Sequence, residues 1–140
     1  MRLLLDTCAL SELFARKPCK AVLSLIEETP GNDLFVSVIS IGEIEKGIQL
    51  LPHGARRAGI QKWASDMEKR FPQSLLKIDK ETARIWGEMT AQCQKLGRPL
   101  AVADGLIAAT AQRHSLQLVT RDIGGFEHTG VALVNPWQTR

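Results

Sequence analysis

The chain begins with Met1-Arg2-Leu3-Leu4-Leu5-Asp6-Thr7, a short apolar run that ends abruptly at an aspartate. The run has the length of a β-strand, and its nearly continuous apolarity is typical of a strand buried on both faces. Further short, apolar-rich segments follow at intervals along the chain. We predict strands at 2–5, 34–38, 75–78, 116–120 and 131–134.

Apolar residues with helical spacing separate these predicted strands. One stripe, before a stop at Pro72, consists of Ile60, Trp63, Ala64, Met67 and Phe71. A second helix can be capped by Asp79 and ends before Gly97 and Pro99. Its predicted buried stripe is Ala83, Trp86, Met89, Cys93 and Leu96. Strands that alternate with helices predict an α/β fold with a central parallel sheet and helices on both faces.

Length and composition predict a single domain spanning 1–140, because 140 residues of which 44% are hydrophobic can form one sizeable core. The net charge of +3 permits a polyanionic partner without requiring one. No uncharged run is long enough to cross a membrane, and Asp6 interrupts the apolar start before it could form a secretory leader. We therefore expect a cytoplasmic protein whose cysteines, Cys8, Cys19 and Cys93, are reduced.

Acidic side chains are predicted to gather at the carboxyl edge of the sheet, where open α/β sheets bind their ligands. Asp6 directly follows the first strand, and Asp122 comes two residues after Thr120, where the fourth strand ends. A helix that returns antiparallel to the strands begins at this same edge. Glu43 and Asp104 lie early in two such predicted helices, so we expect them beside the first two acids.

Asp104 is the most informative of these acids, because its neighbours on the helix are apolar. Those neighbours are Ala101, Ile107, Ala108 and Ala111. An ionised carboxylate on a packing face is costly unless it is paired, hydrogen-bonded or bound to a metal. Purely structural interpretations exist for the other acids, since Asp6 can cap a helix and Asp122 can form a turn before Gly124.

Two further pairs of acids leave the assignment open. The apolar stripe of their helix leaves Glu43 and Glu45 both off its centre, so spacing alone does not choose between them. Asp79 and Glu81 are also expected at the carboxyl edge, but a helix cap and a first-turn acid explain both.

Several carboxylates that converge on one pocket repel one another, and a divalent cation relieves that repulsion. Ligands that are all oxygen favour Mg²⁺ or Mn²⁺, and no His or Cys cluster points to zinc. A cation of this kind activates water and neutralises the charge that develops on a phosphodiester. The residues therefore favour hydrolysis of nucleic acid with one or two ions.

Four segments of the chain, in this order, resemble the PIN-domain ribonucleases. They are 3–12 (LLLDTCALSE), 40–47 (SIGEIEKG), 103–111 (ADGLIAATA) and 119–122 (VTRD). The closing Asn135-Pro136-Trp137 is similar to the VapC/FitB toxin branch of that family. One departure is Gly105, where family members often carry Ala or a larger residue; in a helix Gly is consistent with a close approach of another segment.

The resemblance implies a metal-dependent endoribonuclease, the toxin of a toxin–antitoxin pair, built on a three-layer α/β/α fold with a mostly parallel five-stranded sheet. It implies that Asp6, Glu43, Asp104 and Asp122 are the catalytic, metal-holding acids, and it selects Glu43 over Glu45. The hydroxyls of Thr7 and Thr120 are candidates for orienting a metal-bound water or an acid. Lys46, Arg113 and Arg121 are candidates for contacting RNA phosphates.

The resemblance also implies two protein partners. One is a small, DNA-binding, VapB-like antitoxin that lies in an apolar groove and directs a basic side chain to the acids; the other is a second copy of the chain. The residues expected to line that groove are Leu10, Leu13, Phe14, Ile48 and Leu51.

Three alternatives compete with this interpretation. A phospho-receiver module would use Asp79 as its acceptor, but Leu5 and Thr7 flank Asp6 where a second acid is needed, and Arg121 stands where a Lys is needed. A PIN-domain nuclease that processes RNA without being a toxin has the same acids. A catalytically silent scaffold would have lost acids, and none of the four is replaced here.

Overall fold

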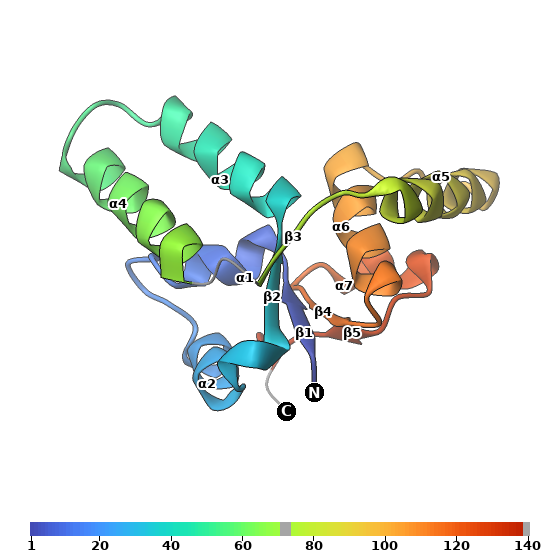
Figure 1. Ribbon diagram of the computed structural model, residues 1–140, viewed down its shortest axis with the longest axis horizontal. Helices are drawn as coiled ribbons and strands as arrows, with labels where there is room; N and C mark the ends of the chain where they lie inside the picture. The colour runs from blue at the N-terminus through green and yellow to red at the C-terminus, as the bar shows by residue number, and fades with distance from the viewer. Residues whose placement is uncertain (71–73, 139–140) are drawn as a thin grey trace.

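The computed structural model describes residues 1–70 and 74–138. Its centre is a five-stranded sheet in the order β3-β2-β1-β4-β5, and each neighbouring pair is parallel (Figure 1). The strands are β1 (Leu3–Leu5), β2 (Leu34–Ser37), β3 (Leu75–Leu76), β4 (Gln117–Val119) and β5 (Leu133–Val134). All five predicted strands are confirmed, each shortened by one or two residues.

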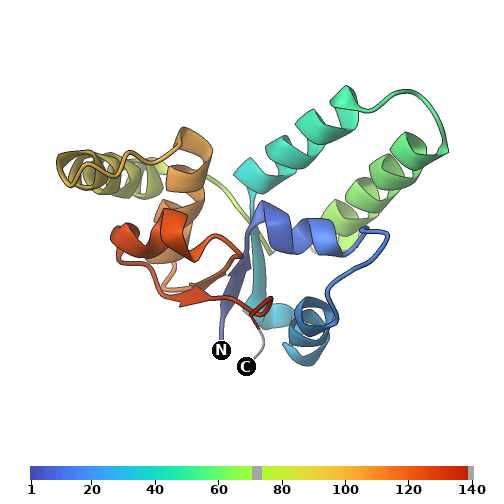
Figure 2. The same cartoon turned by 180° about the vertical axis from the view of Figure 1, so that it is seen from behind.

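Helices flank the sheet on both sides, and the view from behind shows the same two groups separated by the strands (Figure 2). The helices are α1 (Thr7–Glu12), α2 (Lys20–Glu28), α3 (Val38–Leu50), α4 (Ala55–Arg70), α5 (Lys80–Lys95), α6 (Val102–Arg113) and α7 (Ile123–Phe126), with 3-10 turns η1 (Gly31–Asp33) and η3 (Glu127–Thr129). The predicted α/β class with helices on both faces is therefore confirmed.

The central strand β1 shows why the sheet needs helices on both faces. Leu3 and Leu5 pack into one core with α1, α3 and α4, whereas Leu4, which points to the opposite face, packs with α5 and α6. All three leucines are at most 3% exposed. An unbroken apolar run is thus the pattern expected of a strand with a separate core on each side.

The helical stripes are confirmed in part. Ile60 and Met67 of α4 are buried as predicted, whereas Phe71 and Pro72 fall outside the described residues. Asp79 caps α5 by accepting a 2.8 Å hydrogen bond from the Thr82 amide, and Met89 and Cys93 are buried.

Two positions of the predicted α5 stripe are wrong. Ala83 is exposed, and its neighbour Thr82 is buried in its place. Leu96 is 55% exposed because it follows the last helical residue, where the chain turns through Gly97 at φ 72°. The buried stripe of α5 therefore begins at Thr82 instead of Ala83 and keeps Met89 and Cys93 as predicted.

Gly105 of α6 lies where α5 and α6 approach closely. A Cβ atom at this position would lie 2.9 Å from both Cδ1 and Nε1 of Trp86 and 3.3 Å from Cδ2 of Leu100. The expected close approach is therefore confirmed, and it holds the helix that carries Asp104 against its neighbour.

The described residues also bear on membrane spans and on the state of the cysteines. Among them, no helix combines the length and the apolarity that a membrane crossing requires. The thiols of Cys8, Cys19 and Cys93 are free.

Candidate active site

Asp6 directly follows the central strand β1, at the carboxyl edge of the sheet. Its amide donates a 3.1 Å hydrogen bond to the carbonyl of Val119 at the end of β4, which fixes the two strand ends side by side. Its Oδ1 atom accepts a 2.8 Å hydrogen bond from the Ala9 amide, so Asp6 caps α1. The residue is only 5% exposed. The predicted capping role and the predicted place at the edge are thus both observed.

Asp104 is the third residue of α6 and is partly buried at the same edge. Burial raises the pKa of its carboxyl group, and the nearby charges of Glu43 and Asp122 raise that pKa further. Burial also raises the pKa of Asp6, against the hydrogen bonds from Thr120 and Ala9, and the charge of Asp104 adds to the rise. Asp104 is therefore the acid whose charge interacts with those of the other three.

Glu43 and Glu45 differ in their partners, although they lie on the same helix. The Thr7 hydroxyl donates a 2.5 Å hydrogen bond to Oε1 of Glu43. Glu45 is exposed and accepts a 2.8 Å hydrogen bond from the Gln49 side chain, away from the other acids. The Thr7 hydroxyl thus ties Glu43 to α1, whereas Glu45 lies on the surface.

Ser40 belongs to this group, and sequence reasoning missed it. Its side chain is fully buried, and its Oγ lies 3.1 Å from the Thr7 hydroxyl that holds Glu43. The available signal was spacing: Ser40 precedes Glu43 by three residues on α3, so both face the same side of the helix.

Asp122 and Thr120 complete the edge after β4. Asp122 caps the short helix α7 through a 2.9 Å hydrogen bond from the Gly125 amide, which is the turn role that the sequence allows. The Asp122 amide donates to the Thr120 hydroxyl at 3.1 Å, and Thr120 is fully buried. Because Thr120 also hydrogen-bonds to the Asp6 carboxyl group, one hydroxyl links two of the acids.

The four acids have no basic partner in the part of the chain that the structure describes. Its ion pairs join other residues, and none involves Asp6, Glu43, Asp104 or Asp122. Within these residues no three acidic, His or Cys side chains form a ready-made metal cage. The donors are nevertheless all oxygen, and Mg²⁺ typically keeps several waters and takes only one or two carboxylates directly. The set therefore fits a hard, hydrated divalent cation.

The PIN-domain family model matches residues 3–131 of the chain. The chain belongs to the PIN-domain family. The VapC ribonuclease Y4jK of Sinorhizobium fredii is 33% identical over 97% of this chain and 98% of its own length. The Toxin FitB of Neisseria gonorrhoeae is 32% identical over 96% of this chain and 98% of its own length. A solved structure of FitAB bound to a DNA fragment matches with a TM-score of 0.91 and 31% identity, covering 99% of this chain and 97% of the other.

With this membership the phospho-receiver interpretation is wrong, and the position of Asp79 shows why. Asp79 caps α5 and lies 3.9 Å from Nε of Arg113, the last residue of α6. Asp104 is at the other end of that helix, so Asp79 does not join the acidic edge as the strand order suggested.

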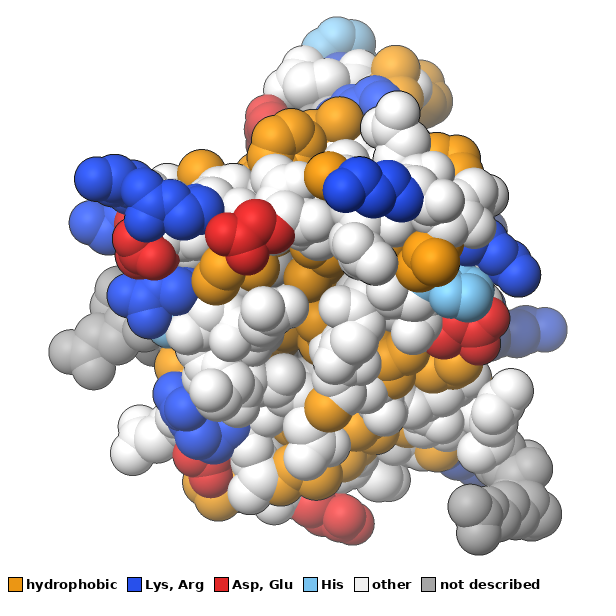
Figure 3. All heavy atoms as spheres, turned by 90° about the vertical axis from the view of Figure 1, so that its right-hand side faces the viewer, with side chains coloured by type: hydrophobic (Ala, Val, Ile, Leu, Met, Phe, Trp, Pro, Cys, Tyr) orange, Lys and Arg blue, Asp and Glu red, His pale blue; other side chains and the backbone are white. Residues whose placement is uncertain are grey.

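The three basic residues that were candidates for RNA contact are not together in this PIN domain. Lys46 is exposed on α3, three residues beyond Glu43, and Arg121 is exposed next to Asp122. Arg113 is instead at the far end of α6 from Asp104. On the face seen from the α5 side, basic side chains stand in separate groups with no continuous band (Figure 3).

The predicted apolar groove is present in part. A cavity of about 260 Å³ opens between α1, α3 and α4, and Phe14, Ile48 and Leu51 line it together with Thr7 and Glu43. Leu10 is instead a core residue at 1% exposure, and Leu13 lines a different cavity beside Trp63. The groove thus runs from apolar side chains directly to one of the four acids.

Proposed function

We propose that this PIN domain is a metal-dependent endoribonuclease and the toxin of a type II toxin–antitoxin module. The observation that carries the proposal is the meeting of Asp6, Glu43, Asp104 and Asp122 at one edge of the sheet with no basic side chain paired to them. Relatives that align over nearly the whole chain bear the names VapC ribonuclease and Toxin FitB, which supports the same activity here.

The four carboxylates are the groups that would hold one or two Mg²⁺ or Mn²⁺ ions. When bound, such an ion supplies an activated water and neutralises the charge that develops on the scissile phosphate. In the protein without metal, burial raises the pKa values of Asp6 and Asp104, and the charges of neighbouring acids raise them further, so a bound cation would favour the ionised carboxylates.

The neighbouring hydroxyls act as positioning groups. Thr7 donates to Oε1 of Glu43 and thereby fixes that carboxyl group, while Thr120 joins Asp6 to the backbone of Asp122. Lys46 and Arg121 are the exposed cations nearest in sequence to these acids and are proposed to contact phosphates.

The proposed partners follow from the groove and from the FitAB likeness. A small DNA-binding antitoxin would place an apolar segment in the cavity between α1, α3 and α4 and direct a basic side chain toward Glu43, which lines the same cavity. A solved neighbour in which FitAB is bound to DNA supports such an assembly. The proposal also includes a homodimer and the cytoplasm as the place of action.

The sharpest test of the activity is Asp104→Asn. We expect this variant to lose Mg²⁺-dependent cleavage of total RNA, measured on gels, because a ligand is lost. Its unfolding temperature in EDTA should equal or exceed that of the parent, because one repulsive, half-buried charge is gone. A variant that unfolds, or one that still cleaves, would contradict the proposal.

Glu43 and Glu45 provide a matched pair on one helix. Glu43→Gln should abolish cleavage, whereas Glu45→Gln should keep it, because only Glu43 contacts Thr7 near the other acids. The measurement is the initial rate of RNA cleavage at saturating Mg²⁺. The reverse result would move the site to the outer face of α3.

A further inference from the structure

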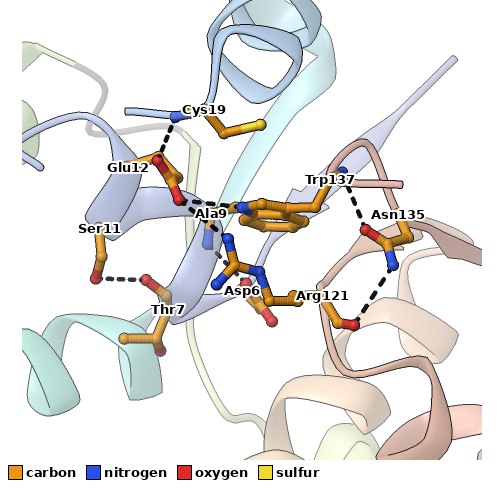
Figure 4. A network of polar contacts seen from close by, with 9 residues as sticks. All are labelled: Asp6, Thr7, Ala9, Ser11, Glu12, Cys19, Arg121, Asn135 and Trp137. Atoms are coloured by element: carbon orange, nitrogen blue, oxygen red, sulfur yellow. Dashed lines mark hydrogen bonds and ion pairs between the residues drawn. The ribbon is translucent and has the colours of Figure 1, made fainter. Parts of the chain in front are cut away.

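Glu12, the last residue of α1, is not one of the four acids, yet Cys19, Arg121 and Trp137 all contact its carboxylate (Figure 4). Its Oε2 atom accepts a 2.7 Å hydrogen bond from the Cys19 amide, and its Oε1 atom accepts a 3.0 Å hydrogen bond from the Trp137 indole. The side chain is only 14% exposed. Glu12 therefore fastens the indole of Trp137 to the first helix.

Trp137 in turn supports Arg121. The guanidinium carbon of Arg121 lies 5.0 Å from the centre of the indole ring, a cation–π contact. One edge of the guanidinium, Nη2, lies 3.6 Å from Oε1 of Glu12. Asn135 secures both neighbours, because it accepts a 3.0 Å hydrogen bond from the Trp137 amide and donates one of 3.5 Å to the Arg121 carbonyl.

The Arg121 guanidinium, although held by these contacts, is accessible to an anion. Arg121 stands between Thr120 and Asp122 at the acidic edge, and its charge acts on the nearby thiol of Cys8. Its side chain is 63% exposed. Among the described residues its N–H groups donate no hydrogen bond, and the contact of Nη2 with Oε1 of Glu12 is 3.6 Å long, so these donors are available to an anion.

We propose that Glu12 is a positioning residue that, through the Trp137 indole, holds the Arg121 guanidinium ready to meet an RNA phosphate at the carboxylate edge. The inference rests on the proposed function, because it requires RNA at this edge. A long side chain that is ordered in advance loses less entropy when it binds. The contacts of Glu12 and Trp137 that hold Arg121 therefore favour phosphate binding.

The alternative is that Glu12 neutralises Arg121 and competes with phosphate. The geometry favours the positioning role, because Glu12 makes its hydrogen bonds of 2.7 and 3.0 Å to Cys19 and Trp137. The contact with Arg121 is the longest of the three. Glu12 therefore orients the Trp137 indole more than it neutralises the Arg121 guanidinium.

Binding of a fluorescein-labelled single-stranded RNA of mixed sequence tests this role. The full chain with Asp104→Asn is used to prevent cleavage, and anisotropy is recorded between about 50 and 200 mM KCl. Arg121→Ala should weaken binding about fivefold, as expected for one exposed ionic contact. It should also reduce the steepness of log K against log salt by about 0.7, the value for one lost phosphate contact on a single strand.

Glu12→Gln should shift affinity and salt dependence in the same direction, and it should add nothing further to Arg121→Ala. Trp137→Phe keeps a ring beneath Arg121 but removes the N–H that Glu12 anchors, so it should reproduce the effect if Glu12→Gln fails to fold. With Asp104 intact, Glu12→Gln should raise KM and leave kcat nearly unchanged. Glu81→Gln, which removes an exposed carboxylate paired with Arg84, is the matched control and should change none of these quantities.

Three outcomes would overturn the inference while the proposed function stands: an unchanged salt dependence in Glu12→Gln, tighter binding in that variant, or an effect that persists in the Arg121→Ala background. Failure of the parent chain to cleave any RNA with Mg²⁺ or Mn²⁺ would instead overturn the proposed function. Failure of the parent to bind RNA would overturn both.

Discussion

Asp6 and Asp79 have the same local role and opposite surroundings. Each follows a strand of the sheet and caps the next helix with a 2.8 Å hydrogen bond from an amide three residues on. Burial raises the pKa of Asp6, and the charge of Asp104 adds to it. Hydrogen bonds from Thr82 lower the pKa of Asp79, and the charge of Arg113 lowers it further. A capping motif therefore does not distinguish a site acid from a structural one, whereas burial and neighbouring charge do.

The largest expected difference between these two caps is in catalysis. Asp6→Asn should reduce kcat/KM for cleavage of total RNA by about a thousandfold or more, as for other residues that act as a catalytic unit. Asp79→Asn should leave cleavage unchanged. Since asparagine caps helices about as well as aspartate, both variants should fold, which circular dichroism would verify. Equal activity in both variants would remove the distinction.

The next effect concerns the contact that holds the helix of Asp104 in place. Gly105→Ala would push a methyl group against Trp86, and overpacking costs about 1–3 kcal/mol, against a helix-propensity gain of about 1 kcal/mol. We expect a net loss of stability in urea titrations. Gly87→Ala on α5, where no atom lies within 4 Å of the added Cβ, should instead stabilise by about 1 kcal/mol. Equal changes in the free energy of unfolding of both variants would show that the α5–α6 contact accommodates a methyl group at position 105 without cost.

The smallest effect is a difference in pH dependence, measured as the unfolding midpoint in EDTA. Asp6 and Asp104 have pKa values raised from 3.8, so the folded state binds more protons than the unfolded state just above that pH. Their contribution to stability is present at low pH and is lost as pH rises through the raised values. Asp79 has a lowered pKa, so its contribution is present above 3.8 and is lost as pH falls through the lowered value.

Variants separate these two contributions. Asp104→Asn should flatten the decline of stability on the high-pH side, and Asp79→Asn should flatten the decline on the acid side. If both variants changed the same side of the profile, the opposite shifts assigned to these carboxyl groups would be contradicted.

Local pattern was enough to predict the sheet and three of the four acids at its edge. Strand ends and helix starts place Asp6, Asp104 and Asp122 by topology alone, because parallel strands end at one edge. Glu43 needed more, since periodicity treated it and Glu45 alike, and the difference lies in the hydroxyl of Thr7 on another helix.

The remaining features depend on contacts between residues far apart in the chain. Ser40 and Glu12 are ordinary polar residues in sequence, and their roles appear only when Thr7 and Trp137 are brought to them. Leu10, expected in the groove, is core, because an apolar stripe does not reveal which of its members another layer covers.

Gly105 of α6 and Trp86 of α5 share the same limited space between the two helices. An added methyl group at 105 has room only if the residue at 86 becomes smaller or turns its ring away. Substitutions at these two positions should therefore be non-additive, and a smaller residue at 86 should relieve the cost of Gly105→Ala.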